Sequence, residues 1–349
     1  MEMQIITYSI PVFFLLLGAE FLYFYKKEIL INFKDVLCNL NTGILSQVFS
    51  LFFKVYAAFL YLLCFEHLNL NKIFSLGLWD SNSISTWVVA FFIVDLIYYF
   101  FHRHSHEFNL FWSAHIVHHS SEHYNLSVAL RQSIFQTFFS AHYLMLGGVL
   151  GIPFEVFLVC YAINLLYQFW IHTEVIKDLG PFELVMNTPS HHRVHHSRQS
   201  EYLDKNYAGV FIIWDRFFKT FKKEQRQVIY GVYPRYKSYN ALNANILPMR
   251  ELFKYFSMTK GPLNKLKLLF KGPTYIFETY KKDRPYPFGV SDFSKTRLNI
   301  KAFWLFALTL GVTLAVLFSE GKVSTSVQLL LLAVILLLVH FTSRQLDSK

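Results

Sequence analysis

The chain has 349 residues, of which 54% are hydrophobic, 19% aromatic and only 16% charged, and its mean hydropathy is +0.32. This composition is typical of an integral membrane protein and excludes an ordinary soluble domain. The formal net charge of +10 resides in the segment 201–300, which holds 19 Lys and Arg against 8 Asp and Glu. Nucleic-acid binding is the weaker interpretation of this charge, because no recognisable reading module accompanies it.

Seven apolar stretches are candidates for membrane spans, because a helix needs about 20 mostly apolar residues to cross a bilayer. In chain order they are 8–25, 43–65, 85–101, 134–150, 153–171, 301–318 and 325–341. The first follows no basic n-region and contains no A-x-A-like cleavage site, so we expect a retained helix and not a signal peptide. Lys54 interrupts the second. Only Gly151-Ile152-Pro153 separates the fourth from the fifth, so this pair is either two spans or a re-entrant hairpin.

Basic residues also orient the predicted spans. Besides the segment 201–300, three lysines lie in 26–42, and Arg103 and Arg131 lie in the histidine-rich stretch. The connecting segments 66–84 and 319–324 are short and poor in Lys and Arg. Under the positive-inside rule, the basic segments belong on the cytoplasmic side. A basic face beside the bilayer also attracts anionic lipid headgroups.

Histidines form three short motifs next to the predicted spans. His102 and His106 have the spacing H-x-x-x-H, and the segments 115–119 and 192–196 both read H-x-x-H-H. Residues at i, i+3 and i+4 share one face of a helix, so each motif is predicted to direct its imidazoles toward one point. Burying so many polar rings without partners would cost several kcal/mol in total. Eight imidazoles exceed the coordination of one metal ion but suit two, and Fe, Zn, Cu and Ni all accept this ligand.

The chemistry of such a site depends on the metal. A zinc hydrolase is not favoured, because "HRHSHE" is not H-E-x-x-H and Glu107 follows the second histidine. Two irons held by neutral histidines at the membrane surface suit the activation of O2 against a C–H bond of a lipid chain. The aromatic stretch 91–101 either lines an acyl-chain tunnel that keeps water out or simply faces lipid.

The sequence around the motifs resembles that of a known family. The stretches "DLIYYFFHRHSHE" (95–107), "HIVHHSSEHYNLSVALRQS" (115–133), the segment 169–221 that opens with "FWIHTE", and "KGP" (271–273) resemble the fatty acid hydroxylase/sterol desaturase superfamily of membrane di-iron enzymes. Within this superfamily, these stretches are most similar to the alkylglycerol monooxygenase branch. The resemblance covers about residues 95–221, with a weaker likeness up to 273.

The resemblance implies a set of metal ligands in this sequence: His102, His106, His115, His118, His119, His172, His192, His195 and His196. His191 is expected beside the ligands as a hydrogen-bonding neighbour, whereas His104 and His123 are expected outside the site. Asp95 and Glu174 are candidates for carboxylates that orient imidazole N–H groups. No catalytic residue beyond the metal site is assigned.

The implied architecture is an all-α integral membrane protein, in which a cytoplasmic helical cap closes a transmembrane bundle over a His-rich di-metal site. Four regions are expected: N-terminal transmembrane helices (1–84), the catalytic region with three histidine motifs (85–221), a basic cytoplasmic segment (222–300) and a C-terminal transmembrane hairpin (301–349). Because one site must collect all three motifs on one face of the membrane, the segment 134–171 has to cross twice or re-enter, reversing near residue 151.

The implied reaction is hydroxylation of a lipid C–H bond with O2 at two iron ions. In the alkylglycerol monooxygenase branch, the oxidised carbon is next to the ether oxygen, the hemiacetal falls apart to an aldehyde and glycerol, and tetrahydrobiopterin is the reductant. The alternatives are a fatty acid or sterol hydroxylase or desaturase supplied by a cytochrome or ferredoxin, and a metal-binding transporter or sensor. A transporter would place polar ligands near the bilayer midplane. The expected location is the endoplasmic reticulum in a eukaryote and the cytoplasmic membrane in a bacterium.

Overall fold

The computed structural model describes residues 2–233, 238–280, 299–318 and 324–347. Within these ranges the chain is helical and contains no strand, only two isolated β-bridges, Met186 with Phe211 and Ser197 with Tyr230. The predicted all-α fold is therefore confirmed. The predicted division into four regions stays a prediction, and 234–237 and 281–298 in its third region lie outside the described residues.

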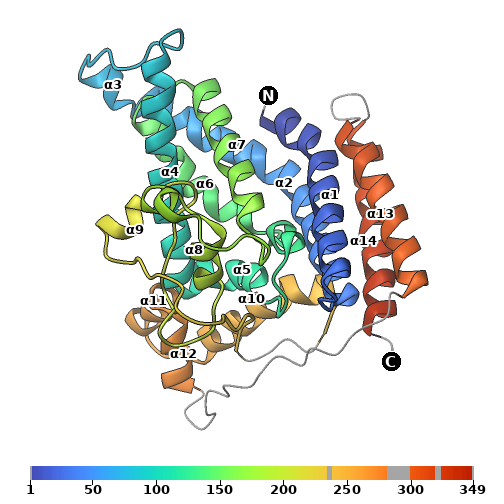
Figure 1. The fold of residues 1–349 in the computed structure, drawn as a ribbon. Helices are drawn as coiled ribbons and strands as arrows, with labels where there is room; N and C mark the ends of the chain where they lie inside the picture. The colour runs from blue at the N-terminus through green and yellow to red at the C-terminus, as the bar shows by residue number, and fades with distance from the viewer. Residues whose placement is uncertain (1, 234–237, 281–298, 319–323, 348–349) are drawn as a thin grey trace.

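Five helices in the described ranges are long and apolar enough to cross a membrane. They are α1 (Glu2–Lys26), α2 (Phe33–His67), α4 (Ile84–Glu107), α13 (Ile300–Phe318) and α14 (Thr325–Asp347). Large apolar side chains on their outer faces are exposed, among them Leu15, Val55 and Trp304. Such exposure suits helices that face lipid hydrocarbon. These helices form the transmembrane bundle that the sequence predicts (Figure 1).

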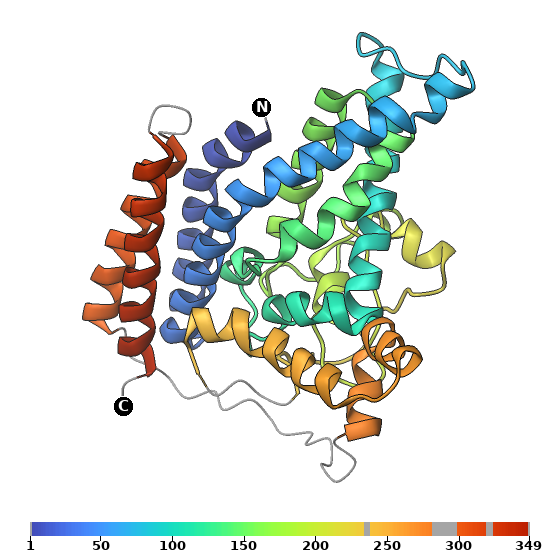
Figure 2. The same ribbon diagram turned by 180° about the vertical axis from the view of Figure 1, so that it is seen from behind.

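Two shorter helices, α6 (Gln136–Val149) and α7 (Phe154–Trp170), form the hairpin predicted for 134–171. The chain reverses at Gly151, whose φ of +75° suits glycine, and the Ile152 amide donates to the Gly147 carbonyl at 3.0 Å. The 14 residues of α6 rise only about 21 Å, less than the hydrocarbon thickness of about 30 Å. Both open ends of the hairpin lie at the same end of the bundle, as both alternatives require, and the short α6 favours the re-entrant one (Figure 2).

Helix α2 crosses the bundle obliquely and packs closely along α6 (Figure 2). The side chain of Asn32 caps its N-terminus by accepting from the Asp35 amide at 3.2 Å. Small residues allow the close approach, since a Cβ on Gly148 would collide with the carbonyl of Tyr61. This tight pair forms one wall of the cavity described below.

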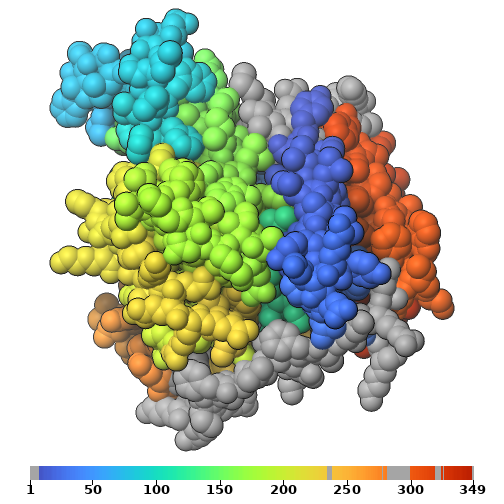
Figure 3. All heavy atoms as spheres, in the orientation of Figure 1, coloured from blue at the N-terminus to red at the C-terminus, as the bar shows by residue number. Residues whose placement is uncertain are grey.

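The remaining elements gather at one end of the bundle as a cap (Figure 1). They are α5 (Asn109–His119), η1 (Leu126–Leu130), η2 (Gly180–Leu184), α8 (Pro189–His195), α9 (Ile213–Phe217), α10 (Ala241–Met258), α11 (Pro262–Phe270) and α12 (Pro273–Tyr280). The short helix α3 (Leu70–Ile73) lies at the opposite end. On the face in Figure 3, the yellow-green to yellow part of the cap lies below the cyan upper end of α4 and beside the blue α1.

Candidate metal centre

Nine buried histidines form two adjoining groups where the cap meets the bundle. Within each group, one ring nitrogen per residue lies within 4.8 Å of every other. The first group is His102, His106, His115, His119 and His195, and the second is His118, His172, His192 and His196. Rings of the two groups touch, since the His119 and His196 ring centroids are 4.3 Å apart. The structure thus brings together all nine residues of the predicted ligand set, and their metal binding stays a prediction.

Each histidine lies at the end of a helix that points into the site. His102 and His106 occupy the last turns of α4, the 115–119 motif closes α5, and His172 follows directly after α7. The third motif belongs to the short helix α8, which begins with Pro189 and ends at its C-cap, His196. Proline suits the first position of a helix, because its missing N–H has no intrahelical partner there. Helix ends from both the bundle and the cap therefore meet at one place.

The H-x-x-H-H motifs do not converge on one point as predicted. His115 and His119 belong to the first group, but His118 belongs to the second. In the other motif, His192 and His196 belong to the second group and His195 to the first. Positions i+3 and i+4 share a broad helix face, yet they differ by about 100° around the axis. The prediction was wrong because each motif divides its rings between two neighbouring centres.

Backbone carbonyls fix the orientation of four of the rings. In each case Nδ1 lies within hydrogen-bond distance of a carbonyl oxygen, which can only accept, so Nδ1 carries the proton and Nε2 keeps its lone pair. The pairs are His102 with Tyr207 (2.8 Å), His118 with Arg131 (3.0 Å), His172 with Gln168 (2.7 Å) and His195 with Lys205 (3.0 Å). These rings therefore present Nε2 lone pairs to the centre of the site.

The spacing of these lone pairs fits bound cations. The Nε2 atoms of His118 and His172 are 3.2 Å apart, although both rings carry their proton on Nδ1. No hydrogen is then available between them, so the two lone pairs repel unless a cation separates them. Nitrogens bound at about 2.1 Å to one ion lie about 3 Å apart when they subtend nearly a right angle. The Nε2 atoms of His172 and His192 are 3.0 Å apart, and those of His102 and His115 are 3.1 Å apart.

Burial keeps the rings in the neutral form that binds metals. Desolvation lowers the pKa of His118 to about 4 and holds the pKa of His195 and His196 well below the usual range. Among the described residues, no hydrogen-bond partner meets Nε2 of His106, His195 or His196. Burying a nitrogen without a hydrogen-bond partner costs free energy, and binding of a metal ion by the nitrogen offsets that cost. The donor set therefore fits two transition-metal ions.

The two carboxylates that were predicted to orient imidazole rings accept hydrogen bonds from other groups. Asp95 accepts hydrogen bonds from the amides of Val210 (2.8 Å) and Phe211 (3.0 Å), and among the described residues no imidazole donates to it. Glu174 accepts from the hydroxyl of Tyr230 at 2.9 Å. The expectation that they orient imidazole N–H groups was wrong, because backbone carbonyls take that role in four of the rings.

The remaining candidate histidines lie outside both groups. The Nε2 atom of His191 lies 3.6 Å from the Glu183 carboxylate. His104 lies 2.6 Å from the hydroxyl of Tyr143, and His123 contacts the Asn32 amide at 3.1 Å. The predicted absence of His104 and His123 from the site agrees with these contacts. His191 is no member of the groups either, and its partner is a carboxylate.

Sequence reasoning missed the residues that support the rings. The buried guanidinium of Arg131 donates to the carbonyl of Val117 at 2.7 Å and to Asn39 Oδ1 at 2.8 Å, while its own carbonyl accepts from His118. Trp112 packs against the first group, with its ring 5.1 Å from that of His106. Spacing offers no signal for such residues, because their role depends on the folded contacts.

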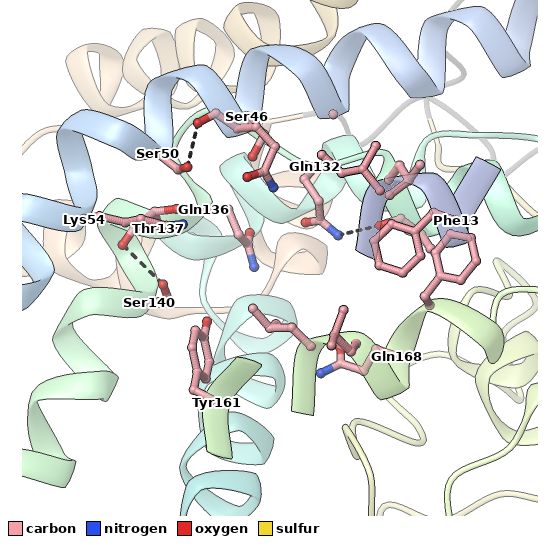
Figure 4. Close-up of a pocket in the computed structure, with 18 of the residues that line it drawn as sticks. Phe13, Ser46, Ser50, Lys54, Gln132, Gln136, Thr137, Ser140, Tyr161 and Gln168 are labelled. Atoms are coloured by element: carbon pink, nitrogen blue, oxygen red, sulfur yellow. Dashed lines mark hydrogen bonds between the residues drawn. The ribbon is translucent and has the colours of Figure 1, made fainter. Parts of the chain in front are cut away.

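A cavity of about 460 Å³ leads from the histidines into the bundle, between α1, α2, α6, α7 and α13. Its size suits a small ligand or part of a lipid chain. Four rings line its inner end: His115, His118, His172 and His192. From the aromatic stretch 91–101, Tyr98 lines the cavity, whereas Phe92 stacks on Phe211. Glutamines and hydroxyl groups share the wall with apolar side chains (Figure 4).

Comparison with known proteins identifies the domain that carries this site. Residues 87–220 match the fatty acid hydroxylase family. The chain is 46% identical to an alkylglycerol monooxygenase of Homo sapiens over 240 residues, which are 68% of this chain and 52% of that protein. An alkylglycerol monooxygenase of Danio rerio is 44% identical over 243 residues, 70% of this chain and 53% of that protein.

A bacterial relative is more distant. An ornithine lipid hydroxylase of Rhizobium tropici is 31% identical over 143 residues, 40% of this chain and 42% of that protein. The chain spans about half the length of the alkylglycerol monooxygenases that it matches. No solved structure matches the chain. The match of residues 87–220 to the fatty acid hydroxylase family confirms the resemblance predicted from the sequence around the histidine motifs.

Proposed function

We propose that the protein is an O2-dependent lipid monooxygenase of the membrane, and that its nine histidines hold two iron ions. One observation carries the proposal: unprotonated Nε2 atoms of His118 and His172 face each other at 3.2 Å, at the inner end of a cavity within the bundle. The similarity to alkylglycerol monooxygenases supports the same class of reaction.

Two bound irons would supply the activation of O2 that insertion of oxygen into a C–H bond requires. The chain itself provides three conditions for this chemistry. Backbone carbonyls such as those of Tyr207 and Arg131 fix the rings, burial keeps them neutral, and the cavity receives an alkyl chain away from bulk water. One oxygen atom enters the C–H bond, and the other leaves as water with two electrons and two protons from a reductant.

The substrate that the relatives favour is an ether lipid with an alkylglycerol head. Hydroxylation of the carbon beside the ether oxygen gives a hemiacetal, which separates into an aldehyde and glycerol. Following the resemblance, the reductant is reduced tetrahydrobiopterin. A second candidate is hydroxylation of an acyl lipid with electrons from a cytochrome or ferredoxin, which the likeness to an ornithine lipid hydroxylase supports.

A transporter is less well supported. His102 and His106 lie in the last turns of α4, next to the cap, and not midway along the helix. Transport sites are expected near the bilayer midplane. The cap belongs on the cytoplasmic side in this proposal, because its helices α10 and α11 carry exposed cations such as Lys254 and Lys267. The membrane would be the endoplasmic reticulum in a eukaryote and the cytoplasmic membrane in a bacterium.

The proposal is tested with purified, iron-loaded protein in detergent. Hexadecylglycerol and hexadecanoic acid are each supplied with O2 and, in separate assays, with tetrahydrobiopterin, a reduced cytochrome, a reduced ferredoxin or no reductant, and products are identified by mass spectrometry. Pterin-dependent release of hexadecanal from hexadecylglycerol is the expected result. Hydroxylation of the fatty acid alone would favour the second candidate, and no product from either lipid with any of the three reductants would refute the oxygenase assignment.

A further inference from the structure

Three glutamines surround the inner end of the cavity. Gln132 and Gln136 come from the segment between η1 and the start of α6, and Gln168 comes from the last turn of α7. Figure 4 shows their side chains directed toward the same open space. Gln132 is beside His118 of the second group, and Gln136 is beside His115 of the first. The two amides therefore border both histidine groups from the cavity side.

The hydrogen bonds of these amides differ. Gln168 donates to Asn164 Oδ1 at 2.7 Å, which holds it in place. In the part of the chain that the structure describes, Gln132 makes one long hydrogen bond, to the Ala129 carbonyl at 3.3 Å. Its amide nitrogen also lies 3.4 Å from His118 Nδ1, but that atom carries a proton and cannot accept. An amide in a partly dry cavity is costly without good partners, so Gln132 is well suited to bind a ligand.

The far end of the cavity is apolar. Phe154, Phe157 and Leu158 line it. The hydroxyl of Tyr61 already donates to the Ile152 carbonyl at 2.7 Å, so this residue offers mainly its ring. Transfer of methylene groups from water into such surroundings lowers the free energy, whereas hydroxyl and ether oxygens require hydrogen-bonding partners. The two ends of the cavity thus match the two parts of an amphiphilic lipid.

We propose that Gln132 and Gln136 bind the oxygen atoms of the lipid head, while the alkyl chain extends toward Tyr61 and Phe157. This orientation places the first carbon of the chain, beside the ether oxygen, next to the histidine groups. It makes the two glutamines specificity residues that select the oxidised carbon. The inference rests on the proposed oxygenase function and adds the direction in which the substrate lies.

The opposite orientation is less favourable. Lys54, Ser50 and Ser140 line the α2–α6 wall, away from Gln132 and Gln168 in Figure 4. The two serine hydroxyls already donate to carbonyls of their own helices, at 2.7 and 3.2 Å. A head at the glutamines also lies near the cap, with its chain directed into the bundle. Lys54 therefore provides the control position for the test.

The test compares two lipids that differ only in their heads, hexadecylglycerol and hexadecyl methyl ether. Radiolabelled forms are bound to the wild type, Gln132→Leu, Gln136→Leu and Lys54→Met proteins in detergent. Each leucine substitution should weaken binding of hexadecylglycerol about 5- to 10-fold, the effect expected from losing one hydrogen bond. Binding of the methyl ether should be unchanged, and Lys54→Met should affect neither lipid. Unchanged metal content in each variant confirms an intact site.

A second readout is the position of oxidation. The double variant Gln132→Leu/Gln136→Leu should yield products hydroxylated further along the chain, because the head no longer fixes the first carbon. Equal binding of both lipids by all variants would overturn the inference, as would a head-specific loss in Lys54→Met. If wild-type protein binds hexadecylglycerol through the glutamines but oxidises no lipid, the subsite stands and the proposed function fails.

Discussion

Replacing Asp95 by asparagine tests how the scaffold supports the metal centre. The fully buried carboxylate accepts four hydrogen bonds, two on each oxygen. Oδ1 accepts from Val210 N at 2.8 Å and Asn164 Nδ2 at 2.5 Å, and Oδ2 accepts from Phe211 N at 3.0 Å and Trp214 Nε1 at 2.9 Å. These bonds tie α4 to the chain just after Tyr207, whose carbonyl orients His102.

The expected loss follows from the number of bonds. An asparagine keeps one oxygen but replaces the other with an NH2 group, which faces two donors in place of accepting from them. Hydrogen bonds to charged groups each contribute about 1.5–3 kcal/mol, so Asp95→Asn should cost about 3–6 kcal/mol. That is a large share of a typical unfolding free energy of about 5–15 kcal/mol.

Chemical unfolding in detergent, followed by circular dichroism, measures this loss, and metal analysis of the same samples reports the site. We expect an earlier unfolding midpoint and reduced iron content. Asp178→Asn is the matched control, since Asp178 is exposed and its ion pair with Lys223 is at the surface. If Asp95→Asn unfolded at the same denaturant concentration as the wild type, the role given to this carboxylate would be refuted.

Three further predictions follow from the site and the fold. Elemental analysis should find two metal ions per chain; His118→Ala and His195→Ala should each lower metal content and abolish turnover, because they remove rings from different groups, whereas His104→Ala should preserve both. The unfolding free energy of metal-free protein should fall as the pH drops below about 6.5, since buried rings such as His118, with a pKa of about 4, stay neutral when folded but bind protons when unfolded; pH-independent stability between 7 and 5 would contradict this. Thiol reagents applied to membrane vesicles should label a cysteine introduced at Ser257, in the cap, from one side of the membrane and a cysteine introduced at Ser75, at the opposite end, from the other side. The three native cysteines are buried and should contribute little labelling. Labelling of both introduced cysteines from one side would disprove the orientation.

The sequence identified the histidines but not their partition. The spacing H-x-x-H-H and the family resemblance pointed to the nine rings that the structure brings together. Which ion each ring would serve depends on how α5 and α8 approach one another across the site, and one helix alone contains no information about that. The two-group arrangement therefore required the fold.

The groups that orient the imidazole rings could not be predicted from the sequence for a different reason. Four rings donate to backbone carbonyls, among them those of Arg131 and Lys205, and every residue type supplies a carbonyl. The sequence therefore drew attention to Asp95 and Glu174, whose carboxylates hold other partners. The hairpin at 134–171 was easier to predict, because Gly151 and Pro153 interrupt the apolar pattern where the chain reverses.

The divided motifs couple the two halves of the site to one another. The first group takes rings from α4, α5 and α8, and the second takes rings from α5, α8 and His172 after α7. Helices α5 and α8 thus contribute to both groups, so displacement of either would remove ligands from both of the proposed ions at once. Without cations, the facing lone pairs of His118 and His172 oppose closure of the cap over the bundle. Metal binding removes that repulsion, and folding of the cap and filling of the two sites should therefore proceed as one coupled process.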